Sequence, residues 1–248
     1  ALTALAADST RESQRTKAMA VIGASVGLSF VMAIVLGPVI ASSLGLQGVF
    51  LVTAALGAVG LVIVLTVLPK NAPKAAAIAD GDWAAEHVFG GRLPVLYASV
   101  FLLHGLMMAT FLIIPATLVN TFDFAASEHW KIYLLTVVLS IPPALFIMRM
   151  GRGGEDPRSA LSLAIVSLVG GILVALLAPN LTTVGVGLCF MFLGINALEA
   201  ILPATVTRVA PGRLRGTALG IFATCQFLGI FVGGAIAGLI LSAGGSQA

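Results

Sequence analysis

Two side chains of this sequence could carry a proton through an apolar interior. Glu199 is the one carboxylate, and His104 the one histidine, inside the long apolar segments. A carboxylate placed in a membrane costs roughly 2.5–3.5 kcal/mol, so such a residue usually faces an interior cavity and often takes up a proton. A histidine changes its charge close to neutral pH. Proton transfer is therefore one reading of the two residues. In the other, each is a neutral or paired group that hydrogen-bonds neighbouring helices.

Four uncharged polar residues could line a polar path beside them. Asn196 precedes Glu199 by three residues and shares its helix face. Ser25 and Ser29 are four residues apart on one face of the first apolar segment, and Gln226 lies in the last one. Each of the four could instead hold helices together through a hydrogen bond, so both roles stay open.

Composition identifies the solvent of this chain. Hydrophobic residues make up 59% of the 248 positions and charged residues 9%, whereas a soluble domain has about 25% charged residues. A chain with so few charged residues could not form a surface that faces water on all sides. The composition therefore predicts a protein that is embedded in a lipid bilayer. The net charge of +3 is therefore no sign of a nucleic-acid partner.

The sequence contains no convincing motif for an enzyme, a cofactor or a metal site. The segment Gly23–Gly27 matches the pattern G-x-S-x-G of a hydrolase nucleophile, but that motif requires a strand, a turn and a helix, and here it lies within one apolar helix. The sequence has no phosphate-binding glycine loop with a lysine. Cys189 and Cys225 lie deep in apolar runs, as small apolar fillers do. We therefore expect no enzyme activity, no cofactor and no metal site.

The elements that position the candidate residues are membrane-spanning helices. A span needs about 20 apolar residues, and turn residues divide the two longest runs, at Ser42–Gly45 with Gly48 and at Ala178–Asn180. Seven spans result, at 18–41, 49–68, 94–119, 131–149, 159–177, 183–207 and 216–242. Each must be helical, because backbone polar groups in lipid have to be bonded within the segment. The predicted fold is all-α, a polytopic transmembrane helical bundle.

Basic residues orient these spans. If the seven spans alternate in direction, all of the 13 lysines and arginines except Lys131 fall on one side. Short basic loops stay in the cytoplasm, so we expect the chain to begin inside and to end outside.

An internal repeat relates the two ends of the chain. At an offset of about 200 residues, Leu2 aligns with Leu202, Arg15 with Arg215, and each arginine precedes a glycine-rich helix. Parallel repeats of six spans are one known plan of transporters.

Several segments also resemble one family. Gly37-Pro38 lies in a span where Ala33 and Ala41-Ser42 replace the usual glycines, and two later segments are Asn196-Ala197-Leu198-Glu199-Ala200 and Arg215-Gly216-Thr217-Ala218-Leu219-Gly220. These resemble the major facilitator superfamily, and within it the bacterial drug:proton antiporters.

The resemblance implies a domain organisation. Residues 1–68 would be the remnant of an N-terminal half, from the end of helix four through helices five and six. Residues 69–92 would form the central cytoplasmic loop, and 93–248 most of the C-terminal half, helices seven to eleven. It also implies that Gly37, Pro38, Arg15 and Arg215 form a conformational motif.

The hypothesis is a secondary active transporter of the inner membrane that exports a small molecule in exchange for protons. Glu199 and His104 would couple the protons, and the Gly37-Pro38 helix would control opening. A symporter for uptake is the sister hypothesis. The alternative from another class is a seven-helix receptor or scaffold that transports nothing, against which the repeat argues.

Overall fold

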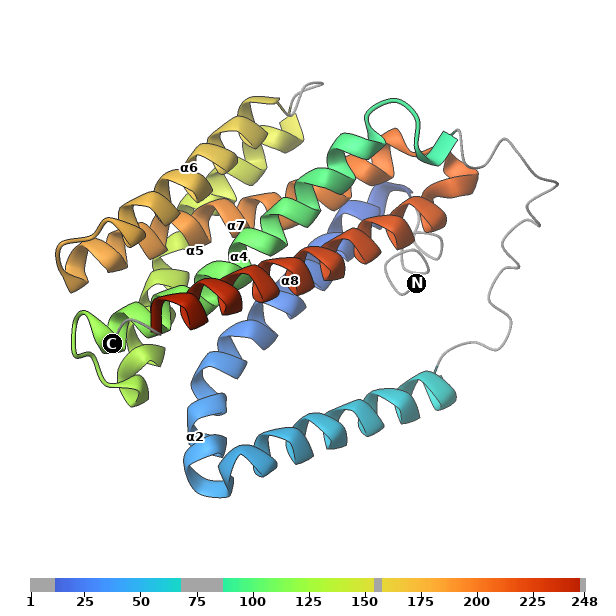
Figure 1. Ribbon diagram of the computed structural model, residues 1–248. Coiled ribbons are helices and arrows are strands. Elements are labelled where there is room, and N and C mark those ends of the chain that lie inside the picture. The colour runs from blue at the N-terminus through green and yellow to red at the C-terminus, as the bar shows by residue number, and fades with distance from the viewer. Residues whose placement is uncertain (1–11, 68–86, 154–157, 246–248) are drawn as a thin grey trace. The chain divides into compact units, whose positions relative to one another are not determined.

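The structure is a computed structural model that describes residues 12–67, 87–153 and 158–245, and within these ranges every regular element is a helix (Figure 1). Two units are present: the first contains helix α2, and the second contains helices α4 to α8. Each unit is described by itself below. The all-helical class predicted from the sequence is confirmed.

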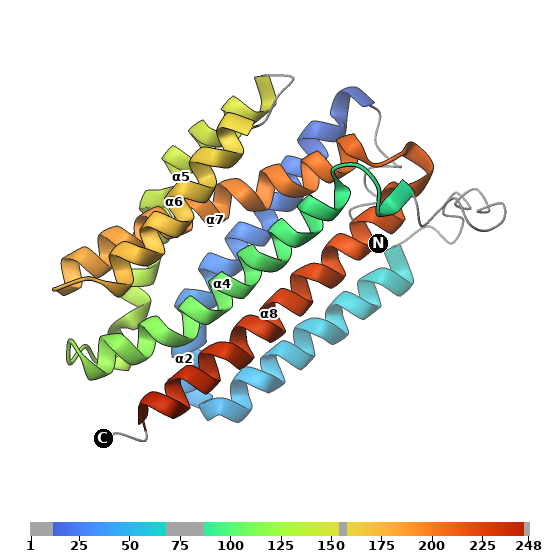
Figure 2. The ribbon, with the colours of Figure 1, turned by 45° about the horizontal axis from the view of Figure 1, so that its top comes forward.

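Helix α2 runs over Glu12–Val67 and is interrupted once, at Gly45. Its apolar stretch Gly27–Val67 has 41 residues, which is roughly 60 Å at 1.5 Å per residue, about twice the thickness of a bilayer core. Figure 2 shows that α2 consists of two helical arms joined by a sharp turn. The stretch therefore provides two spans, and the turn predicted over residues 42–45 is confirmed. The helix begins at Glu12, before the predicted start of the span at residue 18.

Gly45 determines where this turn lies. Its φ of 66° and ψ of −174° lie outside the helical region, in a part of φ/ψ space that glycine enters freely and side chains with a Cβ do not. Gly37 and Pro38 lie in the same helix, where the dihedral angles remain helical. The non-helical turn of the chain is therefore at Gly45.

The second unit contains five long helices. These are α4 (Leu93–Asn120), α5 (His129–Gly153), α6 (Arg158–Leu176), α7 (Leu181–Val209) and α8 (Arg215–Gly245), with short 3₁₀ turns at Ala126–Glu128 and Gly212–Leu214. All five are long and apolar enough to cross a membrane. Together with α2, the described part of the chain has six helices long and apolar enough to cross a membrane, and the sequence-based count of seven treats the two arms of α2 as separate spans.

Short connections make successive helices antiparallel (Figures 1 and 2). The α6–α7 connection is the predicted break at residues 178–180, where the Thr183 amide N–H donates to Asn180 Oδ1 at 2.9 Å. Asn180 thereby satisfies one of the free N–H groups at the start of α7. As a result Arg92, Arg158 and Arg208 lie at one end of the unit, with α8 starting there as well.

Helix α7 forms the centre of this unit. Its side chains are the most deeply buried, and Leu188, Met191 and Val206 have no exposed surface. It packs against α6 on one side and α5 on another, whereas α4 packs mainly against α8. The site described below lies where α4, α7 and α8 meet.

Glycines allow the closest helix contacts. A Cβ on Gly229 or Gly233 of α8 would collide with the backbone of Phe101 or Gly105 of α4. Gly187 of α7 likewise faces the α6 backbone with no room for a Cβ. Small residues at such crossings let helix backbones approach in a membrane, and Gly229 and Gly233 have this role between α8 and α4. Gly238, by contrast, faces open space.

Candidate functional site

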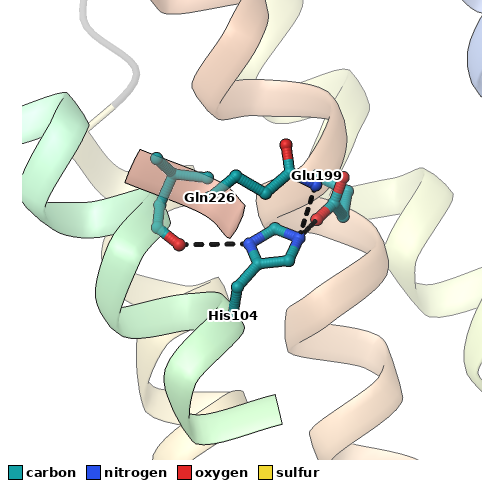
Figure 3. Close-up of polar contacts among 4 residues, drawn as sticks. His104, Glu199 and Gln226 are labelled. Atoms are coloured by element: carbon teal, nitrogen blue, oxygen red, sulfur yellow. Dashed lines mark hydrogen bonds and ion pairs between the residues drawn. The ribbon is translucent and has the colours of Figure 1, made fainter. Parts of the chain in front are cut away.

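His104 is the centre of a polar contact that joins three helices (Figure 3). Its Nε2 atom lies 2.8 Å from Glu199 Oε1 of α7 and 2.8 Å from Gln226 Nε2 of α8. Its Nδ1 atom lies 3.1 Å from the backbone oxygen of Val100, one helical turn earlier in α4. The His104 side chain is 3% exposed, so the imidazole is enclosed by these partners and by the packed helices.

Helix register brings the three side chains to one depth. Counted from the ends that carry Arg92, Arg208 and Arg215, each lies about ten residues into its span, or roughly 15 Å at 1.5 Å per residue. That is near the middle of a bilayer core of about 30 Å. The close glycine contacts of α8 with α4 lie directly beside the site, at Gly105 and Gly229, and they bring Gln226 within reach of the ring.

The Val100 carbonyl determines which ring nitrogen exchanges a proton. A carbonyl oxygen can only accept a hydrogen bond, so Nδ1 carries a hydrogen and donates it. Nε2 is then the atom that gains or loses a proton. When it is protonated, Nε2–H can donate to the Glu199 carboxylate in a charge-assisted bond.

The two members of this pair differ in exposure. The Glu199 side chain is 43% exposed, against 3% for His104. A charge directed into lipid at this depth is costly, so such a residue faces a cavity or an interior surface. Glu199 is therefore the member of the pair that is open to the surroundings of this unit, and His104 is the enclosed one.

Asn196 bonds to a different helix. Its Nδ2 donates to Ser140 Oγ of α5 at 3.0 Å, and Ser140, which has no exposed surface, donates to the Val137 carbonyl at 2.7 Å. The bond links α7 to α5, one turn away from Glu199. Ser140 was not among the residues predicted from the sequence. A serine that also bonds its own helix backbone gives no sequence signal for a partner on another helix.

Ser25 and Ser29 lie in α2 and bond to their own helix. Ser25 Oγ donates to the Val21 carbonyl and Ser29 Oγ to the Ser25 carbonyl, each at 2.8 Å. Both side chains are exposed in that unit. Their predicted place in a polar path stays a prediction.

The predicted conformational motif is divided between the units. Gly37 and Pro38 lie within α2. Arg15 also falls in α2, but its side chain lies outside the described part of the chain. Arg215 begins α8 and is half-buried, and its Nε has no hydrogen-bond partner among the described residues.

An aromatic cluster that sequence reasoning missed lies on the far side of the site from the basic ends. The Phe111 ring centroid is 5.8 Å from that of Tyr133 and 5.9 Å from that of Phe192, and Tyr133 and Phe192 are 6.3 Å apart. Phe111 and Phe192 lie two helical turns from His104 and Glu199 respectively. The spacing of seven residues indicates that Phe111 shares a helix face with His104, and Phe192 with Glu199. It does not indicate that these two faces contact each other.

Six apolar helices long enough to cross a membrane, with a polar contact buried between three of them, define a polytopic membrane protein in the described part of the chain. The profile of the Major Facilitator Superfamily matches residues 1–248, and the chain belongs to that superfamily. The membership predicted from sequence motifs is thereby confirmed, and it places the chain among membrane transporters rather than enzymes.

The chain is also similar to curated bacterial proteins. It is 34% identical over 252 residues to the inner membrane transport protein YajR of Escherichia coli (strain K12), a match that covers 97% of this chain and 54% of that protein. It is 30% identical over 238 residues to an uncharacterized transporter of Buchnera aphidicola subsp. Acyrthosiphon pisum (strain APS), covering 93% of this chain and 60% of that protein. The chain thus spans between half and two thirds of the length of these relatives.

Proposed function

We propose that this chain is part of a secondary transporter of the inner membrane that exports a small molecule in exchange for protons, with His104 and Glu199 as the proton-coupling pair. The observation that carries the proposal is the 2.8 Å contact between a buried imidazole and a partly exposed carboxylate at mid-membrane depth. The similarity to a protein named as an inner membrane transport protein supports the location.

The pair has the chemistry that coupling requires. Glu199 would exchange protons on its exposed side, and the imidazole of His104 on the buried side can bind a second proton at Nε2. Removing the proton leaves a carboxylate that a cationic substrate could neutralise, so proton and substrate would compete for one site. If proton and substrate instead bind together, the same pair would serve a symporter for uptake, which is the second candidate.

The remaining parts follow the plan of the superfamily. Residues 1–68 and 93–248 would belong to its two halves, joined by the cytoplasmic loop 69–92. Gly37, Pro38, Arg15 and Arg215 would act where the halves rock against each other, and Asn196, Ser25, Ser29 and Gln226 would contribute polar groups. A seven-helix receptor or scaffold is disfavoured by membership in a family of transporters.

Proton movement in vesicles tests the proposal. The full-length protein is reconstituted into vesicles loaded with a pH-sensitive dye, and a set of amphipathic organic cations is added outside. We expect compound-dependent proton movement that Glu199→Gln lowers at least tenfold without loss of membrane insertion. Glu128→Gln is the matched control, because Glu128 is an exposed carboxylate paired with Lys131 at the very end of a candidate span rather than at its middle.

The histidine variant separates two forms of the proposal. If the two residues act as a relay, His104→Gln lowers proton movement as much as Glu199→Gln does, whereas a lone carboxylate leaves the His104 variant near normal. A Glu199→Gln protein that moves protons with unchanged pH dependence would show that Glu199 is structural.

A further inference from the structure

Two partners contact a ring atom that can bond only one of them in a given protonation state. His104 Nε2 carries either one hydrogen or one lone pair, yet both Glu199 Oε1 and Gln226 Nε2 lie 2.8 Å from it (Figure 3). Nδ1 offers no alternative, because its hydrogen is donated to Val100. The protonation state of Nε2 therefore selects the partner.

The two partners suit opposite states. An ionised carboxylate only accepts, so it bonds Nε2–H of the charged ring. The amide nitrogen of Gln226 only donates, so it bonds the lone pair of the neutral ring. After a half-turn of the amide, its oxygen can face Nε2–H, but a neutral acceptor bonds the charged ring less strongly than a carboxylate does. Because the Glu199 carboxylate takes Nε2–H of the charged ring, Gln226 adds a bond to Nε2 only when the ring is neutral, and it therefore favours the neutral imidazole.

Helix packing gives the two partners different freedom. Helix α8 is packed closely on α4 through Gly229 and Gly233, whose positions leave no room for a Cβ against Phe101 and Gly105. Helix α7 makes its main contacts with α6 and α5 and touches α4 much less. Gln226 is thus fixed beside His104, whereas Glu199 belongs to a helix that is bound elsewhere.

We propose that Gln226 is a positioning residue that donates a hydrogen bond to His104 Nε2 after the proton has left this atom. Deprotonation would then change the hydrogen-bond partner of Nε2 from Glu199 of α7 to Gln226 of α8. The inference rests on the proposed function of the His104–Glu199 pair. In the loaded state Nε2–H bonds the Glu199 carboxylate. The Nε2–H bond then breaks, its electron pair stays on Nε2, and the proton forms an O–H bond on Oε1. Glu199 turns away and gives this proton to water, and Nε2 accepts an N–H from Gln226.

Few other groups could take part in this exchange. Among the described elements packed against α4, the remaining charged side chains lie near element ends: Arg208 on α7, Arg215 on α8, Arg158 on α6 and Glu128 in the 3₁₀ turn Ala126–Glu128. Cys225 of α8 faces Tyr97, two helical turns before His104. Glu199 is therefore the one charged group in contact with the ring in the described structure.

The test measures the ring itself. The full-length protein is labelled with ¹⁵N-histidine, the His104 resonances are assigned with His104→Gln, and their titration is followed together with proton movement in vesicles. Because Gln226 favours the neutral ring, Gln226→Met should make His104 hold its proton to a higher pH. We expect the titration midpoint and the pH profile of proton movement to move alkaline by about one unit, a tenfold change in proton binding.

A second variant and a control keep the result interpretable. Gln226→Glu keeps the side-chain length but offers only acceptors when ionised, so it should move both midpoints at least as far in the same direction. Thr224→Val alters a neighbouring exposed residue whose hydroxyl bonds its own helix at Gly220, and it should move neither. Unchanged midpoints in both Gln226 variants would overturn the inference.

Failure of the inference can be told from failure of the proposed function. If Glu199→Gln abolishes proton movement while both Gln226 variants titrate like the unaltered protein, the function stands and the Gln226 role is wrong. If the Gln226 variants shift the titration midpoint of His104 but Glu199→Gln leaves proton movement unchanged, Gln226 still selects the hydrogen-bond partner of His104. In that case the His104–Glu199 pair is not the coupling site.

Discussion

The contact between α4 and α8 makes a sharp prediction for Gly233→Ala. A Cβ at this position would overlap the backbone oxygen, Cα and carbonyl carbon of Gly105. Backbone atoms in a helix cannot rotate away as a flexible side chain can, so the two helices would have to separate. Overpacking of this kind costs about 1–3 kcal/mol, and we expect Gly233→Ala to reduce the free energy of unfolding by that amount.

The matched control is Gly238→Ala, five residues further along the same helix. An added Cβ there meets nothing within 4 Å, and alanine favours a helix over glycine by up to about 1 kcal/mol. We therefore expect this variant to unfold at the same denaturant concentration as the unaltered protein or at a slightly higher one.

The assay is unfolding of the purified full-length protein in mixed micelles of rising SDS content, followed by circular dichroism. The same separation should move Gln226 away from His104, so the ¹⁵N signal of the ring should change in Gly233→Ala and not in Gly238→Ala. Equal stability of the two variants would refute the reasoning, because it would mean that the α4–α8 distance does not depend on the absence of this Cβ.

Three further predictions concern one hydrogen bond, one glycine turn and the orientation of the chain in the membrane. In a double-mutant cycle, Asn196→Leu and Ser140→Ala should show a coupling of about 0.6 kcal/mol or more, the usual value for a hydrogen bond between membrane helices; additive effects in SDS unfolding would argue against the bond. Gly45→Ala should destabilise the turn of α2 by about 1–2 kcal/mol, because its φ of 66° disfavours a Cβ, whereas Gly57→Ala, which has open space around it, should not; SDS unfolding that gives both variants the same loss would contradict this. A tag placed after Gly245, at the end of α8, should be reached by a membrane-impermeant reagent from the periplasm, and labelling only in opened cells would show that the predicted orientation is wrong.

The spans and their turns were predictable from the sequence. Length and apolarity identify a membrane helix because lipid requires every backbone group to be bonded within the segment. Gly45 and Asn180 were found within predicted turns because their residue types have specific backbone or capping roles. Glu199 and His104 could be placed at a common depth, since the rise of a helix per residue is fixed.

Only the tertiary structure decided which polar groups meet. From the sequence, Gln226 and Asn196 could each line a polar path or form a hydrogen bond between helices, with no partner identified. The structure supplies the partners: Gln226 contacts His104, and Asn196 bonds to Ser140. It also gathers Phe111, Tyr133 and Phe192 from three helices. The physical reason is that a membrane span is apolar on nearly all faces, so its sequence fixes the depth of a residue but not the direction in which its side chain points. That direction is set by helix rotation, and rotation depends on close contacts such as those of Gly229 and Gly233, which exist only after the helices have packed.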